Sequence, residues 1–350
     1  MSRLRLVSTF AIILFLIGCN RPVATSRPDL FATLQASTPD GLAPAATDSF
    51  ATPGFNFPTP NVTMGSSIPA PSAADQLTGH IVFTCQIFKV QSMDQICIMN
   101  ADGSGMRRLT TENNRRHYYG SLAPDGQSIV YSSYREPNVY EIYSLALDDG
   151  SVQQLTDRIG VLTGPEVSPD GTSIAMAHGD PNTGNVQIML MDRNGENAKD
   201  VPQIVGWDPT WSPDGKQILF ASIAGGSVQL FVADRKGDGM RQVSNLPAVR
   251  GRSDWSADGQ FLVTYSGPAW NREVYMLNAD GSNARRLTPT GGNSQGPSFS
   301  PDGKWVVFTA YFDHYGDDHG CEIYIIRIDS TDLRRLTDNE YCDYQPRWGP

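Results

Sequence analysis

The chain has 350 residues, of which 39% are hydrophobic and 18% are charged, and its formal net charge is −10 at pH 7. This length accommodates one large or two ordinary domains, and the composition is that of a globular protein. The acidic balance argues against a nucleic-acid-binding protein and against a polybasic membrane-binding surface, because both carry an excess of Lys and Arg.

The first twenty residues, MSRLRLVSTFAIILFLIGCN, indicate an export signal. Arg3 and Arg5 precede an apolar segment, residues 6–17, that is too short for a comfortable membrane span. The ending Leu-Ile-Gly-Cys resembles the lipobox of bacterial lipoproteins, which implies cleavage before Cys19 and diacylation of its thiol. The alternative is an ordinary signal peptide with an incidental cysteine. We expect a signal peptide over 1–18 and a lipid-anchored, extracytoplasmic protein in the cell membrane or envelope.

A tether is predicted to follow the lipidated cysteine. Residues 20–76 hold nine of the 24 prolines, many Thr, Ser and Ala, and no Lys. Such a composition buries too little apolar surface to offset chain entropy, so we expect residues 19–76 to form an extended, disordered tether. Asn20 differs from the Asp that retains some lipoproteins in the inner membrane, so the choice between inner membrane, outer membrane and surface stays open.

The remainder of the chain is built on a repeat. A bulky residue, a Pro-Asp-Gly turn and an apolar run recur as LAPDGQSIVY, VSPDGTSIAM, WSPDGKQILF, WSADGQFLVT and FSPDGKWVVF. The turn aspartates lie 45, 44, 44 and 44 residues apart, at Asp125, Asp170, Asp214, Asp258 and Asp302. Each unit contains four strand-like segments separated by turn signals, which predicts a four-stranded antiparallel sheet. The bulky residues before the turns are expected to form the core between sheets.

Six such units predict an all-β fold, a six-bladed β-propeller over residues 77–350. One blade cannot bury both of its faces, whereas six blades in a ring can. The first unit begins with TGHIVFTC (78–85), already in its second strand, and QPRWGP (345–350) matches DPTWSP (208–213). We therefore expect the C-terminal strand to complete blade one and close the ring, which also removes exposed sheet edges.

The pattern W-S-P-D-G, I-x-F, I-Y-x-M-x-x-D-G and R-R-L-T resembles the TolB-type β-propeller repeats, which are similar to WD repeats. The resemblance covers residues 77–350 and implies the propeller fold. A TolB protein also has a small α/β domain before its propeller, and this sequence has the predicted anchor and tether in that place. The resemblance therefore implies the propeller but not the partners of TolB.

Four cysteines besides Cys19 lie in the repeat region, and an even number in an exported domain favours disulfides. Three pairings are possible. Cys85 is expected to close the second strand of blade one and Cys97 to open the third. Cys321 is expected to open the third strand of blade six and Cys342 to lie in the loop that leads to the closing strand, on the same rim. We predict the disulfides Cys85–Cys97 and Cys321–Cys342, the alternative being four buried thiols.

Propeller connectivity assigns the loops of each blade to two rims. The loops between the second and third strands, and those leading to the next blade, fall on what we call the loop rim, and the Asp-Gly turns fall on the turn rim. The loop rim is rich in aromatic and arginine residues, which are common in interfaces and sugar sites. A polar surface without a ligand is the alternative. The predicted binding residues are Arg116, His117, Tyr118, Tyr134, Arg135, Trp207, Arg250, Trp270, Arg272, Tyr311, His314, Tyr315, Tyr341 and Tyr344.

Metal binding and catalysis have weaker support. The segment DHYGDDHG (313–320) offers His314, Asp317 and His319 as candidate metal ligands, although such a loop is more often simply solvated. His117 and His178 would join them only if the loops converge over the channel. No nucleophile elbow, HExxH, Walker or dinucleotide motif is present, so we assign no catalytic residue and no cofactor. Glu166 and Asp254, on innermost strands, are expected to bond turns and backbone, and the alternative is that they line the channel.

These features predict a monomeric, non-catalytic binding module that holds an envelope protein or a glycan through its loop rim. The alternative is a metal-assisted propeller enzyme, a lyase or hydrolase acting on polysaccharide fragments. A structural spacer or a subunit of a larger machine is a third reading. The sequence names neither the partner nor the substrate.

Overall fold

The computed structural model describes residues 77–86, 93–112, 114–311 and 321–350. The predicted signal peptide, Cys19 and the tether lie outside the described residues, as do Tyr315, His314, Asp317 and His319. The described part is all-β, with 24 strands and no helix. It therefore offers no apolar helix of membrane-spanning length.

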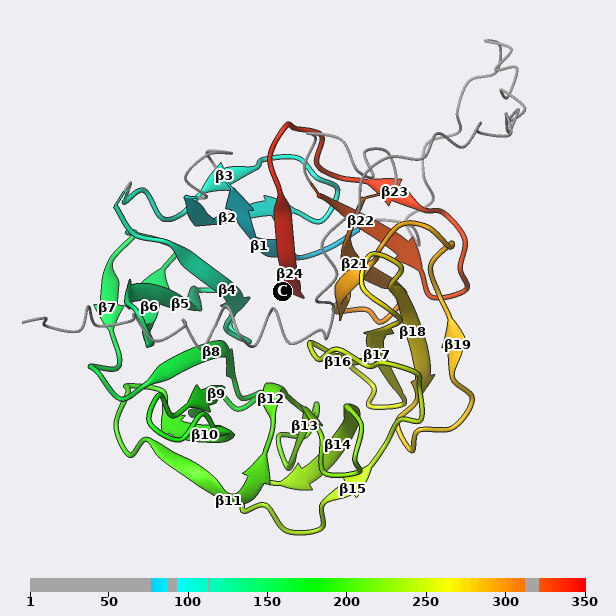
Figure 1. The fold of residues 1–350 in the computed structure, drawn as a ribbon. Coiled ribbons are helices and arrows are strands. Elements are labelled where there is room, and N and C mark those ends of the chain that lie inside the picture. Colours follow the sequence, from blue (N-terminus) through cyan, green and yellow to red (C-terminus); the bar gives the residue numbers. More distant parts are fainter. Residues whose placement is uncertain (1–76, 87–92, 113, 312–320) are drawn as a thin grey trace, which may run out of the picture.

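The strands form a ring of six four-stranded antiparallel blades around a central axis (Figure 1). Four blades are separate sheets, and the other two share an eight-stranded sheet. A single parallel bridge, between Tyr140 and Val161, joins those two blades. The predicted all-β propeller is confirmed.

Each blade runs from an innermost strand beside the axis to an outermost strand. Blade 1 contains β24 (Asp343–Gly349), β1 (His80–Gln86), β2 (Asp94–Asn100) and β3 (Arg107–Arg108), and blade 2 contains β4 (His117–Leu122), β5 (Ser128–Glu136), β6 (Val139–Ala146) and β7 (Val152–Gln154). Blade 3 contains β8 (Val161–Val167), β9 (Ser173–Gly179), β10 (Val186–Asp192) and β11 (Lys199–Val205), and blade 4 contains β12 (Trp207–Trp211), β13 (Gln217–Ser222), β14 (Gln229–Asp234) and β15 (Arg241–Gln242). Blade 5 contains β16 (Asp254–Trp255), β17 (Phe261–Ser266), β18 (Glu273–Asn278) and β19 (Arg285–Arg286), and blade 6 contains β20 (Gln295–Phe299), β21 (Trp305–Ala310), β22 (Glu322–Arg327) and β23 (Arg334–Arg335).

The C-terminal strand closes the ring, as predicted. β24 runs antiparallel to β1, with His80 opposite Gly349 and Cys85 opposite Asp343. In Figure 1 the red C-terminal strand lies beside the blue β1 and ends near the axis. Blade 1 is thus assembled from the two ends of the propeller sequence.

The Pro-Asp-Gly turn is held by its aspartate. Asp214 accepts hydrogen bonds from the Ser212 hydroxyl at 2.7 Å and from the Lys216 amide at 3.1 Å. Gly215 follows in the left-handed region with a φ of 67°, which costs glycine little. The aspartates of the other turns make the corresponding bonds to the backbone two residues on, so their role is to form turns.

A second repeated contact explains the Leu-Thr that ends most outer strands. The Thr156 hydroxyl accepts a hydrogen bond from the Ile142 amide at 3.0 Å and donates one to the Glu141 carboxylate at 2.6 Å. The same hydroxyl-to-side-chain bond links Gln229 with Ser244, Glu273 with Thr288 and Glu322 with Thr337. We call this bonded pair the clasp, because in blades 2, 4, 5 and 6 it fastens the outer segment to the third strand.

The bulky residues before the turns pack between blades, as expected. Trp348 lies with Phe83 of its own blade against Trp305 and Val307 of blade 6, and Trp211 packs with Ile188 of blade 3. Burial of apolar surface stabilises the fold by roughly 25 cal/mol for each Å² removed from water. These tryptophans are core residues rather than ligand platforms.

Both predicted disulfides are present. Cys85 bonds Cys97 across β1 and β2, and Cys321 bonds Cys342, which tethers the closing strand to blade 6. Cys97 does not open its strand but is the fourth residue of β2, opposite Phe83, so the first disulfide joins diagonal neighbours. Disulfides persist in oxidising compartments and indicate an extracytoplasmic protein.

Candidate functional site: the channel and its mouth

In each innermost strand, two positions face the channel. Both are defined by their distance in sequence from the bulky residue that precedes the turn, and they recur in all six blades. Three residues before it lies what we call the mouth ring, formed by Tyr119, Gly164, Asp208, Arg252, Gly296 and Gln345. One residue before it lies the inner ring, formed by Ser121, Glu166, Thr210, Asp254, Ser298 and Arg347. Five mouth-ring residues have φ between 51° and 61°, and register shifts interrupt most inner strands at this point. The repeat therefore builds a bulge toward the axis in nearly every blade.

Arg347 closes the channel at the inner ring. Its guanidinium, on blade 1, forms an ion pair with Glu166 of blade 3 and lies 3.7 Å from the Asp254 carboxylate of blade 5. It also donates to the Ser253 carbonyl at 3.1 Å. The Arg347 side chain is only 7% exposed, so three alternate blades meet in a buried charged cluster rather than around an open bore.

The two inner-ring carboxylates, Glu166 and Asp254, both interact with Arg347 in this cluster. Burial raises the pKa of Glu166, the charge of Asp254 raises it further, and Arg347 opposes both effects. The Asp254 carboxylate also accepts hydrogen bonds from the Ser298 hydroxyl at 2.7 Å and from the Phe299 amide at 3.0 Å. The backbone role expected for Asp254 is therefore correct but incomplete, because both carboxylates face Arg347.

A second buried arginine lies in the mouth ring. The Arg252 amide donates to the Asp208 carboxylate at 3.0 Å, and its guanidinium donates to the Gln345 carbonyl at 3.3 Å. The guanidinium lies 5.1 Å from the centre of the Tyr119 ring, a cation–π arrangement. Burial and the charge of Arg347 lower the pKa of Arg252 to about 10, so it stays charged at neutral pH.

On blades 1 and 2 the predicted rim aromatics are packed against neighbouring groups, and they are half-buried or buried. Tyr344 donates to the Asp94 carboxylate at 2.9 Å, and Tyr118 packs with Tyr140. The Arg116 guanidinium lies 4.9 Å from the centre of the Tyr134 ring. Tyr118 is buried, so its expected exposure on the rim is wrong.

His117 is also inside the protein, which corrects its assignment to the exposed rim. It is buried at the start of β4 and packs edge-on against Tyr131, with ring centres 5.3 Å apart. Its ring nitrogens have no hydrogen-bond partner among the described residues. Burial and the charge of Arg115 together lower the pKa of His117 to about 4, so this imidazole is neutral at pH 7.

On blades 4 to 6 the predicted residues form a partly exposed cluster. The Trp207 indole donates to the Arg250 carbonyl at 3.3 Å, and the Arg250 side chain donates to the Gly267 carbonyl at 3.4 Å. Trp270 is 61% exposed and meets Tyr311 edge-to-face, with ring centres 6.0 Å apart. Arg272 is half-buried and donates to the Gln295 side chain at 2.8 Å. This sector keeps the predicted rim residues at the surface.

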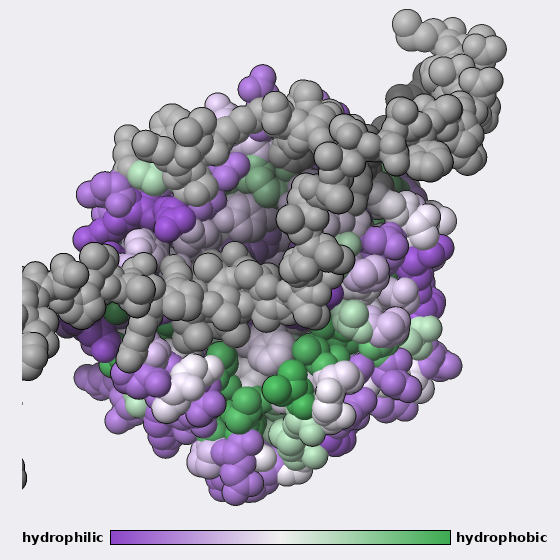
Figure 2. Space-filling model, in the orientation of Figure 1, coloured by the Kyte–Doolittle hydropathy of each residue, from purple (hydrophilic) through white to green (hydrophobic). Residues whose placement is uncertain are grey.

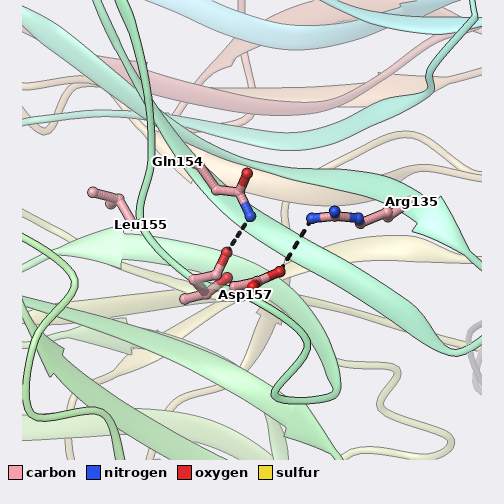
Figure 3. Close-up of a pocket in the computed structure, with 5 residues that line it drawn as sticks. Arg135, Gln154, Leu155 and Asp157 are labelled. Carbon is pink, nitrogen blue, oxygen red and sulfur yellow. Dashed lines mark hydrogen bonds and ion pairs between the residues drawn. The ribbon is translucent and has the colours of Figure 1, made fainter.

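Two predicted residues lie apart from both clusters. Arg135 forms an ion pair with Asp157 at 3.2 Å, on the wall of a pocket of about 360 Å³ that Leu155 also lines (Figure 3). Gln154 in the same pocket donates to the Thr156 carbonyl at 2.6 Å. Tyr341 lies in the loop before β24, half-buried. The polar groups drawn in Figure 3 bond one another rather than pointing at a common centre.

No group of three metal-ligating side chains occurs among the residues for which the structure gives positions. His178, considered as a partner for the candidate metal loop, bonds the Asp200 carboxylate at 2.7 Å and the Ile159 carbonyl at 2.8 Å. The bond to Asp200 joins β9, the second strand of blade 3, to its outer strand β11. The loop 313–320 lies outside the described residues, so its metal ligands stay a prediction.

Sequence reasoning missed the two buried arginines, Arg252 and Arg347. A signal for them exists in the repeat itself. At the inner-ring position most units carry Ser, Thr or a carboxylate, and one carries Arg347. An isolated positive charge at an equivalent innermost position indicates a counter-charge across the axis.

Comparisons with known proteins show relatives in sequence and in fold. No family model matches. A TolB homolog of Chlorobium luteolum is 28% identical over 185 residues, 53% of this chain and 32% of that protein. An uncharacterized peptidase of Bacillus subtilis is 27% identical over 192 residues, 43% of this chain and 29% of that protein. The chain thus spans about a third of the length of these two relatives.

The fold is similar to that of TolB from Acinetobacter baumannii. The two structures match with a TM-score of 0.66 and 24% identity, over 78% of this chain and 67% of that one. The six closed blades and their repeated turns agree with this likeness. The described part of the chain is a TolB-like β-propeller.

Proposed function

We propose that this protein is a lipid-anchored, extracytoplasmic binding module that holds a protein or a glycan on the loop rim of its propeller and catalyses no reaction. The observation that carries the proposal is the surface cluster on blades 4 to 6. There Trp270 is 61% exposed beside Tyr311 and two arginines. Aromatic and arginine side chains of this kind dominate binding energy at interfaces.

The titratable groups near the channel support binding rather than catalysis. A general acid or base needs an ionisable group within reach of the reacting atoms. Glu166 and Asp254 are paired with buried Arg347, and the Asp208 carboxylate accepts a hydrogen bond from the Arg252 amide. His178 uses both ring nitrogens in bonds to neighbouring residues. Among the described residues around the channel, these groups are engaged in holding the ring together.

Anchoring through Cys19 is part of the proposal. The segment before Cys19 has the basic front, short apolar core and small-residue end of an exported lipoprotein signal. The two disulfides fit an oxidising compartment. A tether of the composition found in residues 20–76 would let the propeller reach partners at a distance from the membrane.

Cross-linking in intact cells tests the proposal. The full chain and its Trp270→Ala variant are expressed at matched levels and cross-linked, and captured proteins and glycans are identified by mass spectrometry. We expect a species that the wild type captures and the variant loses at unchanged melting temperature. Met240→Ala is the matched control, because Met240 is also exposed but precedes an outer strand. Equal capture by Trp270→Ala would contradict the assignment of the rim.

A further inference from the structure

We propose that the partner is a polypeptide segment in which acidic residues adjoin apolar ones, and that it binds across blades 4 to 6 at Arg250, Arg272 and Trp270. This inference deepens the proposed function and rests on it. It assigns one sector of the ring as the binding surface and specifies the chemistry of the occupant.

The sector is one continuous surface. Trp207 donates to the Arg250 carbonyl, and Arg250 in turn reaches the Gly267 carbonyl in the loop between β17 and β18. That loop also carries Trp270 and leads to Arg272, whose guanidinium bonds Gln295 of blade 6. A chain of direct contacts therefore runs across three blades from β12 to β20.

Charge on the loop rim is unevenly balanced. Arg115, Arg135 and Arg158 each form an ion pair with a rim carboxylate. Arg250 and Arg272 have no carboxylate within 4.0 Å among the residues that the structure describes. Burial lowers the pKa of Arg272, and the nearby charge of Arg250 lowers it further, so the two guanidiniums repel each other. A carboxylate from outside would relieve that repulsion and accept two forked hydrogen bonds.

Apolar side chains lie close in sequence to the residues that contact the arginines, since Val205 is two residues before Trp207, whose indole bonds the Arg250 carbonyl. Val205 and Ile223 are among the most exposed large hydrophobic residues of the described chain. They are neighbours, since the Ser222 hydroxyl donates to the Val205 carbonyl at 2.7 Å. On the face drawn in Figure 2, hydrophobic residues gather in the lower half of the ring, where Figure 1 places β12 to β14. Exposed aliphatic residues beside arginines fit a protein partner better than a sugar, which needs polar contacts around the aromatic ring.

The backbone presents Trp270 outward at an energetic cost. Trp270 has a φ of 62°, and Gly267 in the same loop has a φ of 131°. A bulky residue in the left-handed region costs on the order of 1 kcal/mol or more, and such strain concentrates at functional sites. The Asn271 amide donates to the Pro268 carbonyl at 3.1 Å and fixes the turn. The loop therefore projects the indole next to the arginine pair.

Selection from a displayed library of random short peptides tests the proposal on the full, disulfide-bonded chain. Peptides enriched on the wild type are counter-selected on Arg250→Gln/Arg272→Gln and on Trp270→Ala, and Kd is measured by fluorescence anisotropy. We expect enriched peptides with Asp or Glu next to aromatic or aliphatic residues. Their affinity should fall at least about tenfold in the double variant and weaken with added salt.

Two controls keep the outcome interpretable. Arg107→Gln/Arg108→Gln removes two exposed arginines from the edge strand β3 and should leave Kd unchanged. Arg250→Lys/Arg272→Lys keeps the charge but not the planar fork, and should recover only part of the affinity. Melting temperatures verify that each variant is folded.

Three results would overturn the proposal. They are enrichment of peptides without acidic residues, equal binding by the Arg250→Gln/Arg272→Gln variant, and enrichment of no peptide at all. If no peptide binds while an acidic oligosaccharide binds in a Trp270-dependent manner, the occupant is wrong but the proposed function stands. If neither class of ligand depends on Trp270, the proposed rim function fails as well.

Discussion

Replacing Asp343 by Asn is expected to stabilise the protein more at pH 8 than at pH 5. Asp343 lies at the start of the closing strand, is 2% exposed, and accepts a hydrogen bond from the Asn339 amide group at 2.7 Å. Burial raises the pKa of Asp343 to about 7, Asn339 and Thr337 oppose the shift, and the nearby carboxylate of Glu322 adds to it. The closing strand therefore carries a carboxyl group that the fold keeps protonated in mild acid.

The sign and size follow from linkage. The pKa of Asp343 is higher in the folded protein than its ordinary value of 3.8, so the folded state binds the proton more tightly. Its contribution to stability is complete below about pH 4 and is lost as the pH rises to about 7. Between pH 5 and pH 8 the loss spans about two pKa units, or roughly 2.7 kcal/mol at 1.36 kcal/mol per unit.

Denaturant unfolding under non-reducing conditions measures this difference. The free energy of unfolding of Asp343→Asn, relative to wild type, should rise by about 2 to 3 kcal/mol between pH 5 and pH 8. Asp238→Asn is the matched control, since Asp238 is exposed in a turn. An effect of Asp343→Asn that is equal at both pH values would refute the reasoning.

Three further changes test the closure of the ring and the anchor. Arg347→Ala should destabilise the protein by about 3 to 5 kcal/mol in denaturant unfolding, because it leaves the inner-ring carboxylates buried and unpaired; a cost below 1 kcal/mol would contradict the buried cluster. Cys321→Ser/Cys342→Ser should cost about 3 kcal/mol, measured as a lower melting temperature and a smaller further decrease on reduction, because only Cys85–Cys97 remains to be reduced. Cys19→Ala should abolish incorporation of labelled fatty acid and release the chain from membranes, and retained label would exclude the lipobox reading.

The propeller was predictable because the same turn and strand pattern occurs in several blades. Five copies of one turn, and a C-terminal match to a missing first strand, determine the blades and their closure. Both disulfides followed from the same placement of Cys85, Cys97, Cys321 and Cys342 on adjacent segments. Here local sequence signals and the global fold agree, which is the condition under which pattern reasoning succeeds.

The candidate site was only partly predictable. His117 and Tyr118 were expected on the exposed rim. In the structure they are the first two residues of the innermost strand β4, and both side chains are buried. Arg252 and Arg347 were missed because register shifts interrupt the inner strands, so simple alternation does not show which side chains face the axis. Contacts that cross the channel join residues about 90 to 180 positions apart, such as Arg347 with Asp254 and Glu166, and no local pattern encodes them.

Because β24 completes blade 1, the ring cannot assemble until β24 has been made. Until then the strand that becomes β1 has an unsatisfied edge, and Trp305 of blade 6 lacks its neighbour Trp348 in the core between the two blades. Such long-range pairing slows folding and exposes intermediates to aggregation. Loss of β24 should therefore yield chains that remain open and are degraded by proteases, although the other five blades are intact.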